Sequence, residues 1–492
     1  MLKEKETLEK NKKKVDEFLT EKKISFVEPV SMEGGMEFLE YLIGEGISDD
    51  LADVKYVRER EPLGNPEVFP IIYMIALLTE VGSTRRTQEV LKNEAMMKML
   101  GFSEEQIKNG ITKRGKKNQY GGGFARKSGV MASTTVVDNL ACFDYPELVN
   151  CFNLYIKRVS LRGEIDFGHI YILDSTIVET EPGYPGAMPI KVKDDEGNET
   201  GRTVWGFKVF ILTSAKTLVP VAVHITSAND ADSPMLIEMV KKGVDNLGEG
   251  RIKTVLADRG FIDGKQLYQL KHEMGIDFVI PVRKNMDIWK CMVGLRDDNK
   301  NNIEEWEYGK KGLSGGYLSK GSVSYSQYSD VDAGNKKYKN GSPLNAVVVT
   351  RWDGEEISAG NEKVIVTSGE VGSAVELIEL YGQRSLIENC NFRELKQAAS
   401  LGSLPQQKNT EIAKDTAYAH MLLCVFALAI FNILVETAHS NTPEVIGKLP
   451  KNIREFNFIK KCEKPKMFVL CKHYYYIYEM KEFMGFCGFE YV

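Results

Sequence analysis

The sequence predicts an α/β fold with a mixed sheet, an antiparallel β insertion and a mainly helical N-terminal region. Between about residues 36 and 153, apolar residues recur at three- and four-residue spacing, which is typical of helices. At about Gly168 the pattern changes to short runs of β-branched and aromatic residues, which predict strands. From about residue 285 to 369, clusters of Gly and Asn separate further short strands, which indicates the insertion.

The composition is that of a folded protein with several domains. Of the 492 residues, 43% are apolar and 10% aromatic, enough for a large core. The formal net charge of -5 argues mildly against a nucleic-acid partner unless basic residues cluster locally. The 8 cysteines include no CxxC pair, and the Lys- and Glu-rich start has no secretory signal. We therefore expect reduced thiols and a cytoplasmic protein.

The N-terminal region is expected to contain an exposed helix or frayed arm over residues 1–23, and buried helices over 70–78 and 89–100. Between these two buried helices, Arg85 and Arg86 follow a Gly-containing turn, the arrangement of a helix-turn-helix unit. Any two packed helices joined by such a turn have the same pattern, so a purely structural turn is the alternative.

A basic cluster supplies the local positive charge that a DNA partner requires. It lies in a stretch without acids that also contains three consecutive glycines, which allow close backbone approach. The alternative is a solvated loop. The cluster consists of Lys113, Arg114, Lys116, Lys117, Arg126 and Lys127.

The predicted core alternates strands and helices in the order βββαβαβ. Its first strand is almost entirely apolar and should be buried on both faces. The expected strands are residues 169–173, 204–212, 219–225, 254–257 and 278–281, and the expected helices are 234–246 and 264–274. After the insertion, with strands at 321–328, 346–352 and 364–367, a helix should run from Ala374 to about Ala399.

One apolar run, Ala417 to Val435, is long enough to cross a membrane. It contains His420 and Asn432 and has no basic cluster at either end, so we expect a buried core helix and no membrane. A membrane-associated protein is the alternative.

Two acids directly follow predicted buried strands. Asp174 follows the strand 169–173, and Asp258 follows the strand 254–257. Open α/β sheets place their ligands at this edge, where a carboxylate is held rigidly. Each acid alone has a simpler interpretation as a turn or N-cap residue.

A third acid lies in the predicted helix. The helical step of about 100° per residue puts Tyr381, Arg384 and Glu388 on one face. An Arg and a Glu four residues apart often form only a surface ion pair.

This combination resembles the DDE transposases of bacterial insertion sequences, whose catalytic domain has an RNase H-like fold. The shared features are the strand-Asp, strand-Asp, helix-Glu order and the Tyr-x-x-Arg-x-x-x-Glu run ending at Glu388. The sequences of residues 258–261 and 392–396, and a β insertion between the second Asp and the Glu, add to the resemblance. It covers roughly Ile170 to Leu434.

The resemblance implies a division of the chain into five segments. We expect a helical DNA-binding region, an RNase H-like core in two parts around the β insertion, and a C-terminal region. Their expected bounds are 1–168, 169–284, 285–370 (the insertion), 371–436 and 437–492.

The resemblance also implies a site for two Mg²⁺ ions, with Mn²⁺ as the alternative, in which Asp174 is shared and Asp258 and Glu388 each complete one side. Two such ions stabilise the attacking and leaving oxygens of an in-line displacement at phosphorus. Oxygen ligands without a His or Cys cluster favour these ions over zinc. Glu179 and Glu181 are alternative ligands, disfavoured because the predicted strand has ended before them.

Tyr381, Arg384 and Lys396 are implied to contact the DNA backbone near the scissile phosphate. In many relatives a Lys follows the Glu after six residues, whereas here that position is Leu395 and the Lys comes one residue later. In a regular helix this displaces Lys396 by about 80° from Glu388. Four tryptophans are candidates for stacking on an unpaired base, with a core role as the alternative: Trp205, Trp289, Trp306 and Trp352.

The implied partners are double-stranded DNA, as terminal inverted repeats and as target, and a second copy of the chain in a synaptic homodimer. The implied location is the bacterial cytoplasm, at the nucleoid. Two rivals are a DNA-binding protein without catalysis and a two-metal nuclease that only hydrolyses. A zinc site is a further candidate, although the spacing fits no common pattern, and it would use Cys462, Cys471, His473 and Cys487.

Overall fold

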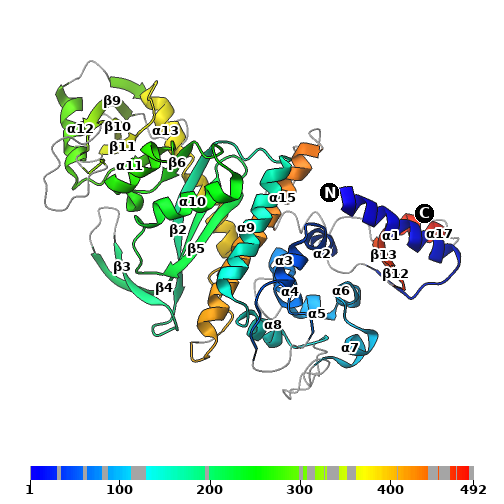
Figure 1. Cartoon of the computed structure of the whole chain (residues 1–492). Coiled ribbons are helices and arrows are strands. Elements are labelled where there is room, and N and C mark those ends of the chain that lie inside the picture. The colour runs from blue at the N-terminus through cyan, green and yellow to red at the C-terminus, as the bar shows by residue number, and fades with distance from the viewer. Residues whose placement is uncertain are drawn as a thin grey trace. The chain divides into compact units, whose positions relative to one another are not determined.

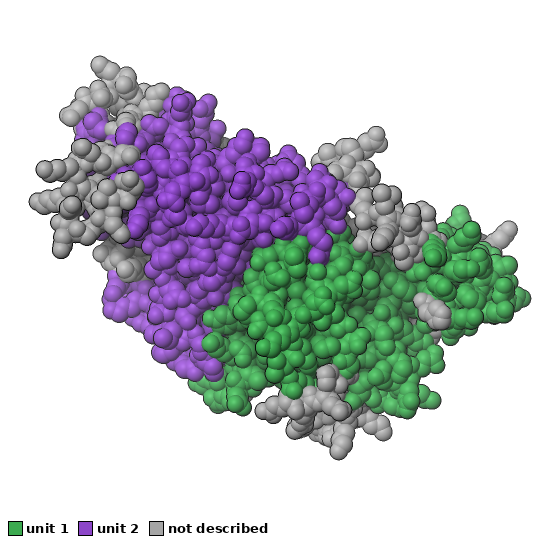
Figure 2. Space-filling model, in the orientation of Figure 1, with its two compact units in different colours: residues 1–155, 394–431, 441–492 green, residues 156–393, 432–440 purple. Residues whose placement is uncertain are grey.

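The computed structural model describes most of the chain (Figure 1). The described residues are 2–29, 35–58, 64–79, 87–111, 129–193, 199–298, 303–306, 316–325, 327–329, 343–351, 362–406, 408–441, 453, 466–472 and 474–486. They form two compact units (Figure 2), of which unit 1 comprises residues 1–155, 394–431 and 441–492 and unit 2 comprises residues 156–393 and 432–440. The domain boundaries expected from the sequence stay predictions.

The core of unit 2 is a mixed sheet in the order β5-β4-β2-β6-β7. β4 runs antiparallel to both β2 and β5, whereas β6 is parallel to β2 and β7 is parallel to β6. This strand order is that of an RNase H-like core, so the expected fold class is confirmed. The strands are β2 (Ile170–Thr180), β4 (Glu199–Ser214), β5 (Pro220–Ser227), β6 (Thr254–Ala257) and β7 (Asp277–Pro281).

The inserted strands continue this sheet. β11 pairs antiparallel with β7, and β10, β9 and β8 follow in antiparallel order. The sequence did not predict the short helix α12 (Asp287–Asp298) before them, or β3 (Met188–Lys193) on the edge of β4. The inserted strands are β8 (Ile303–Trp306), β9 (Gly316–Ser324), β10 (Pro343–Arg351) and β11 (Glu362–Thr367).

Several sequence-based element boundaries in the core were wrong, and two of them lie in the elements that carry Asp174 and Glu388. β2 continues to Thr180 because its second half pairs with β4, whereas the apolar run that marked the predicted strand ends at Leu173. The helix expected from Ala374 to Ala399 is interrupted: α13 (Ala374–Gly382) is followed by a turn, then a π-helix, Ile387–Phe392, and α14 (Arg393–Gln397). Apolar spacing does not distinguish a π turn from an α turn, and the buried contacts that accompany this one are tertiary.

Helices cover the sheet. α10 (Met235–Leu247) packs on β4 and β5, and α11 (Gly264–His272) packs on β7. The π-helix contacts β2, and its buried Asn391 donates hydrogen bonds from Nδ2 to Thr213 Oγ1 (2.9 Å) and to the carbonyl oxygen of Leu218 (3.1 Å).

Unit 1 is mainly helical, as the sequence predicted. The helix expected over residues 89–100 is divided, because the Asn93 side chain accepts a hydrogen bond from the Met96 amide (3.0 Å) and caps a new helix. Its helices include α2 (Gly35–Gly44), α3 (Ile47–Ala52), α4 (Val68–Leu78), α5 (Thr87–Lys92), α6 (Glu94–Met99), α7 (Glu104–Asn109), α8 (Ser133–Leu140) and the first part of α9 (Tyr145–Arg162).

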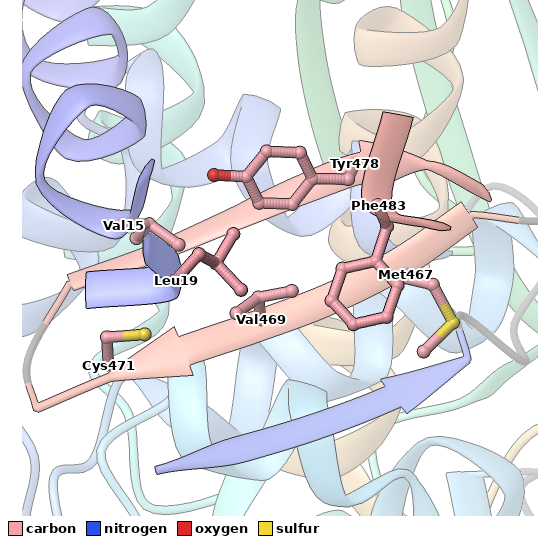
Figure 3. Close-up of a cluster of buried hydrophobic side chains, with 7 residues drawn as sticks. All are labelled: Val15, Leu19, Met467, Val469, Cys471, Tyr478 and Phe483. Atoms are coloured by element: carbon pink, nitrogen blue, oxygen red, sulfur yellow. The ribbon is translucent and has the colours of Figure 1, made fainter. Parts of the chain in front are cut away.

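The two ends of the printed sequence meet in a small module of unit 1. A three-stranded sheet, β1-β12-β13, combines β1 (Phe26–Pro29), β12 (Lys466–Cys471) and β13 (Tyr474–Glu479), next to α1 (Leu2–Thr20) and α17 (Met480–Phe486). Figure 3 shows the apolar cluster that joins them. Of the exposed helix or frayed arm expected at the N-terminus, the helix is present as α1, but it is not fully exposed, because it buries Val15 and Leu19 in this cluster. Too few apolar residues lie in α1 to reveal this by periodicity.

The long apolar helix α15 (Ala413–Asn441) is long and apolar enough to cross a membrane between Ala413 and Thr437. Of its most apolar window, 78% is buried within the structure, as expected for a core helix. His420, which is 1% exposed, lies there with its Nδ1 at 2.7 Å from the hydroxyl of Tyr73.

Candidate active site

Asp174 and Asp258 lie side by side in the core sheet, at the point where parallel pairing stops. The last paired residues of β2 and β6 are Leu173 and Ala257, and each carboxylate follows directly. β2 then continues along β4, while the chain after Asp258 turns away through a short 3-10 helix, Arg259–Phe261. The sequence therefore predicted the position of both residues correctly, although Asp174 lies within its strand and not at the end.

Asp174 is a buried carboxylate, 7% exposed. Burial raises its pKa to about 7, although the nearby Arg384 charge and the hydrogen bond from the Ser175 amide (2.8 Å) both favour the ionised form. The negative charges of Asp258 and Glu388 raise this pKa further. All three predicted carboxylates thus belong to one electrostatic cluster.

Arg384 bridges two of the three carboxylates. Its Nη1 donates to Asp174 Oδ2 (2.6 Å) and its Nη2 donates to Glu388 Oε1 (2.7 Å). Burial would lower the pKa of Arg384, but Asp174, Tyr381, Asp258 and Glu388 together raise it above its ordinary value. The Arg384 and Glu388 pair is therefore not an isolated surface ion pair, because the same guanidinium also binds a buried strand residue 210 positions away.

Tyr381 also belongs to this cluster of interacting side chains. It is 8% exposed, and burial raises the pKa of its phenol well above the ordinary value. The ammonium group of Lys363, on β11, lies 4.6 Å from the centre of its ring. Tyr381, Arg384 and Glu388 thus act on one site despite the turn and the π-helix between them.

The alternative ligand Glu179 has a different environment. It is exposed at the far end of β2, and Arg202 Nη2 donates to its Oε1 (3.2 Å) and Oε2 (2.9 Å). The largest charge effects on Asp174 come from Arg384, Asp258 and Glu388 and not from Glu179. Asp174 therefore stays the better candidate, although the reason given from the sequence, that the strand had ended, was wrong.

The carboxylate oxygens of the cluster are the type of ligand that a hard divalent cation prefers. One guanidinium incompletely balances three carboxylates, and burial raises the pKa of Asp174, as expected for a buried acid without enough positive charge around it. As they stand, the described residues include no group of three or more His, Cys, Asp or Glu side chains arranged around one point, since Arg384 lies between Asp174 and Glu388.

Several candidates lie elsewhere or outside the described residues. Lys396 is exposed on α14. Trp205 and Trp289 are half-buried, while the side chains of Trp306 and Trp352 fall outside the description. Also outside it are Arg85 and Arg86, the whole basic cluster of residues 113–127, and three of the four proposed zinc ligands. The fourth, Cys471, is buried and free against α1.

The sequence-based reasoning missed a second group of polar side chains beside the cluster. Lys208 of β4 has a side chain that is 6% exposed, and its Nζ donates to Asp232 Oδ1 (3.0 Å) and to the carbonyl oxygen of Asp230 (2.7 Å). Ser175 Oγ also lies 3.4 Å from Asp232 Oδ1. The signal was present: a lysine in the middle of an apolar strand is buried rarely, and then with a partner.

Comparisons with known proteins assign a family to half of the chain. The family model described as the transposase DDE domain matches residues 166–413, half of the chain. No curated protein matches the chain. Among solved structures, the chain is similar to the piggyBac transposase synaptic complex with hairpin DNA, determined by cryo-EM, with 12% sequence identity and a TM-score of 0.42; the match covers 89% of this chain and 82% of that one.

Proposed function

The chain belongs to the transposase DDE domain family, and from this we propose that it cuts DNA strands at transposon ends and joins the freed 3′-hydroxyl to target DNA. The observation that carries the proposal is that Arg384 binds both Asp174 and Glu388, while the charge of Asp258 acts on the same two residues, Asp174 and Arg384. These residues come from two strands and a helix that are remote in the sequence, and all lie within the region that the family model matches.

Asp174, Asp258 and Glu388 would hold two Mg²⁺ ions, or Mn²⁺, with Asp174 shared. Such ions lower the pKa of the attacking hydroxyl and stabilise the leaving oxygen. The protein's part is to fix the carboxylates: β2 and β6 hold the two aspartates in register, and the π-helix holds Glu388. Arg384, released in part from its carboxylates, has the two-pronged geometry that a phosphate accepts.

Lys396 is proposed to contact the DNA backbone with Tyr381 and Arg384. A π turn adds one residue to the helical path relative to an α-helix. Glu388 lies near the start of the π-helix Ile387–Phe392 and Lys396 lies after its end, so the π turn on the path between them offsets the one-residue displacement that the sequence shows. Leu395, the residue at the usual spacing, is fully buried. This offset supports keeping Lys396 in the proposal with Tyr381 and Arg384.

The proposed partners are DNA with terminal inverted repeats, target DNA, and a second copy of the chain that pairs the two ends. The basic cluster of residues 113–127 is proposed as a contact with the repeats. We also propose that the chain comes from a bacterial insertion sequence and acts in the cytoplasm at the nucleoid.

A strand-transfer assay with the element's own ends tests the function. The wild-type chain with Mg²⁺ should give joined product, and Asp174→Asn, Asp258→Asn and Glu388→Gln should each reduce it by about a thousandfold or more, because each removes a ligand of the ions. Glu179→Gln is the control and should remain active. Cleavage without joined product would identify a nuclease, and DNA binding without either would identify a protein without catalysis.

A further inference from the structure

Asp232 contacts the strand that carries Asp174 and also lies against the turn that follows Asp258. It lies between β5 and α10 and accepts hydrogen bonds from Lys208 Nζ (3.0 Å) and Ser175 Oγ (3.4 Å). Ser175 follows Asp174 in β2. Because successive residues of a strand point to opposite faces, Ser175 reaches Asp232 on the face that α10 covers, while Asp174 points to the other face.

The other oxygen of Asp232 lies against the turn that follows Asp258. A Cβ atom added to Gly260 would lie 2.7 Å from Asp232 Oδ2, closer than a real contact allows. Gly260 belongs to the short helix Arg259–Phe261, which begins directly after Asp258. The glycine therefore lets this turn rest on the Asp232 carboxylate.

Phe261 fixes the same turn at a second point. Its ring is 1% exposed and lies 6.2 Å, edge to face, from the ring of Phe210. Phe210 is two residues from Lys208 in β4 and pairs with Ser175. One short segment of β4 thus holds both Asp232 and Phe261, and between them the backbone of Asp258 has little freedom to move.

Asp232 is not a fourth member of the carboxylate cluster. The largest charge effects on Asp174 are those of Arg384, Asp258 and Glu388. The charge of Asp232 is balanced by Lys208, whose side chain is 6% exposed.

We propose that Asp232, held by Lys208 and Ser175, is a positioning residue that sets the place of Asp258 relative to Asp174 through the turn at Gly260. The proposal rests on the proposed function, because it assigns Asp232 a role only in the binding of metal by the two aspartates. Residues that orient metal ligands typically change the affinity for the metal by about 10- to 100-fold when substituted.

A second aspartate in the structure has the same kinds of neighbours as Asp232: a lysine, a serine and a glycine. Asp277, at the start of β7, accepts hydrogen bonds from Lys271 Nζ (2.7 Å) and Ser368 Oγ (2.8 Å) and also lies beside a glycine, Gly369. It pairs with Thr254 at the start of β6, the opposite end from Asp258. Asp277→Asn therefore removes a comparable Lys, Ser and Asp group without touching the turn after Asp258.

The test is a titration of the full chain with Mn²⁺, followed by electron paramagnetic resonance. Asp232→Asn and Gly260→Ala should each weaken Mn²⁺ binding by about 10- to 100-fold and raise the Mg²⁺ concentration needed for half-maximal DNA cleavage. Gly260→Ala leaves every charge in place and guards against loss of the fold in Asp232→Asn. The double variant should be no weaker than the more affected single variant, because both changes act on one contact.

Asp277→Asn and Gly369→Ala should bind Mn²⁺ as the wild type does, with melting temperatures recorded for all variants. Unchanged affinity in Asp232→Asn and Gly260→Ala, or an equal loss in Asp277→Asn, would overturn the proposal. Asp174→Asn distinguishes failure of this proposal from failure of the proposed function. If this variant also binds Mn²⁺ normally and cuts DNA, the assignment of the carboxylates as the metal site is wrong, and the role of Asp232 is wrong with it.

Discussion

The guanidinium of Arg384 is one positive charge placed among three carboxylates. The sequence predicted this residue and all three acids, because strand ends and helical spacing are local patterns. It did not predict the contact of Arg384 with Asp174, or the Lys208 and Asp232 pair, because those depend on which strands become neighbours. The residues of a site can thus be predicted from local sequence patterns, whereas the contacts between them cannot.

Arg384→Ala should destabilise the metal-free protein more than the loss of an exposed ion pair does. It leaves the buried Asp174 without its nearest cation, which should lower the free energy of unfolding by about 3 kcal/mol at about pH 8. The loss should be smaller near pH 6, where Asp174 takes up a proton instead. Arg202→Ala, which breaks the exposed pair with Glu179, is the control and should cost at most about 1 kcal/mol in urea denaturation. Equal losses in the two variants would contradict this account of Arg384.

The raised pKa of Asp174 gives stability a dependence on pH. Its folded-state pKa is about 7, whereas a carboxyl in an unfolded chain titrates near ~3.9. Between these values the folded chain binds the extra proton, so the metal-free protein should become less stable as pH rises from about 4 to about 7, with no further change above. Asp174→Asn should remove this part of the slope. Denaturation across that range measures it, and identical slopes would show that Asp174 is ionised throughout.

For helices and strands, the presence of an element was easier to predict from the sequence than the residues at which it begins and ends. β6 begins and ends where its apolar run does, because it is short and buried. β2 extends past its apolar run, since pairing with β4 and not composition sets its end. The π-helix was not predictable from the spacing of apolar residues. It contains Asn391, a polar side chain that tertiary hydrogen bonds hold in a buried position.

Deleting Asn389 tests the function of the π-helix. This exposed residue follows Glu388, and its removal should convert the π turn to an α turn while Asn391 keeps its buried hydrogen bonds. Glu388, together with Arg384 on the same side of the deletion, would then rotate by about 100° relative to Asp174, and strand transfer should fall by about a hundredfold or more. The substitution Asn389→Ala keeps the residue count and should remain active. A fully active deletion variant with an unchanged melting temperature would show that the π turn does not position Glu388.

At the scale of the molecule, long-range pairings were the part that the sequence did not reveal. β11 extends the core sheet from far along the chain, and β1 joins β12 although more than 430 residues separate them. Each pairing joins short strands whose local patterns are compatible with many partners. The packing role of α1, which is rich in Lys and Glu, was not predictable either. Its apolar residues Val15 and Leu19 pack against strands near the other end of the sequence.

The module formed by α1, β1, β12, β13 and α17 has an apolar cluster of its own, so it should lose its structure without loss of the catalytic sheet. Val469 is fully buried against α1, and Val469→Asp places a charge there that has no partner in the cluster. Hydrogen exchange should become fast in α1, β1 and β12, while β2, β4 and β6 keep their protection, because exchange reports local opening. Lys481→Asp, on the exposed side of α17, makes the same kind of change without burial and should leave exchange in α1 slow. Faster exchange throughout β2 and β6 in Val469→Asp would show that the module and the catalytic sheet unfold together.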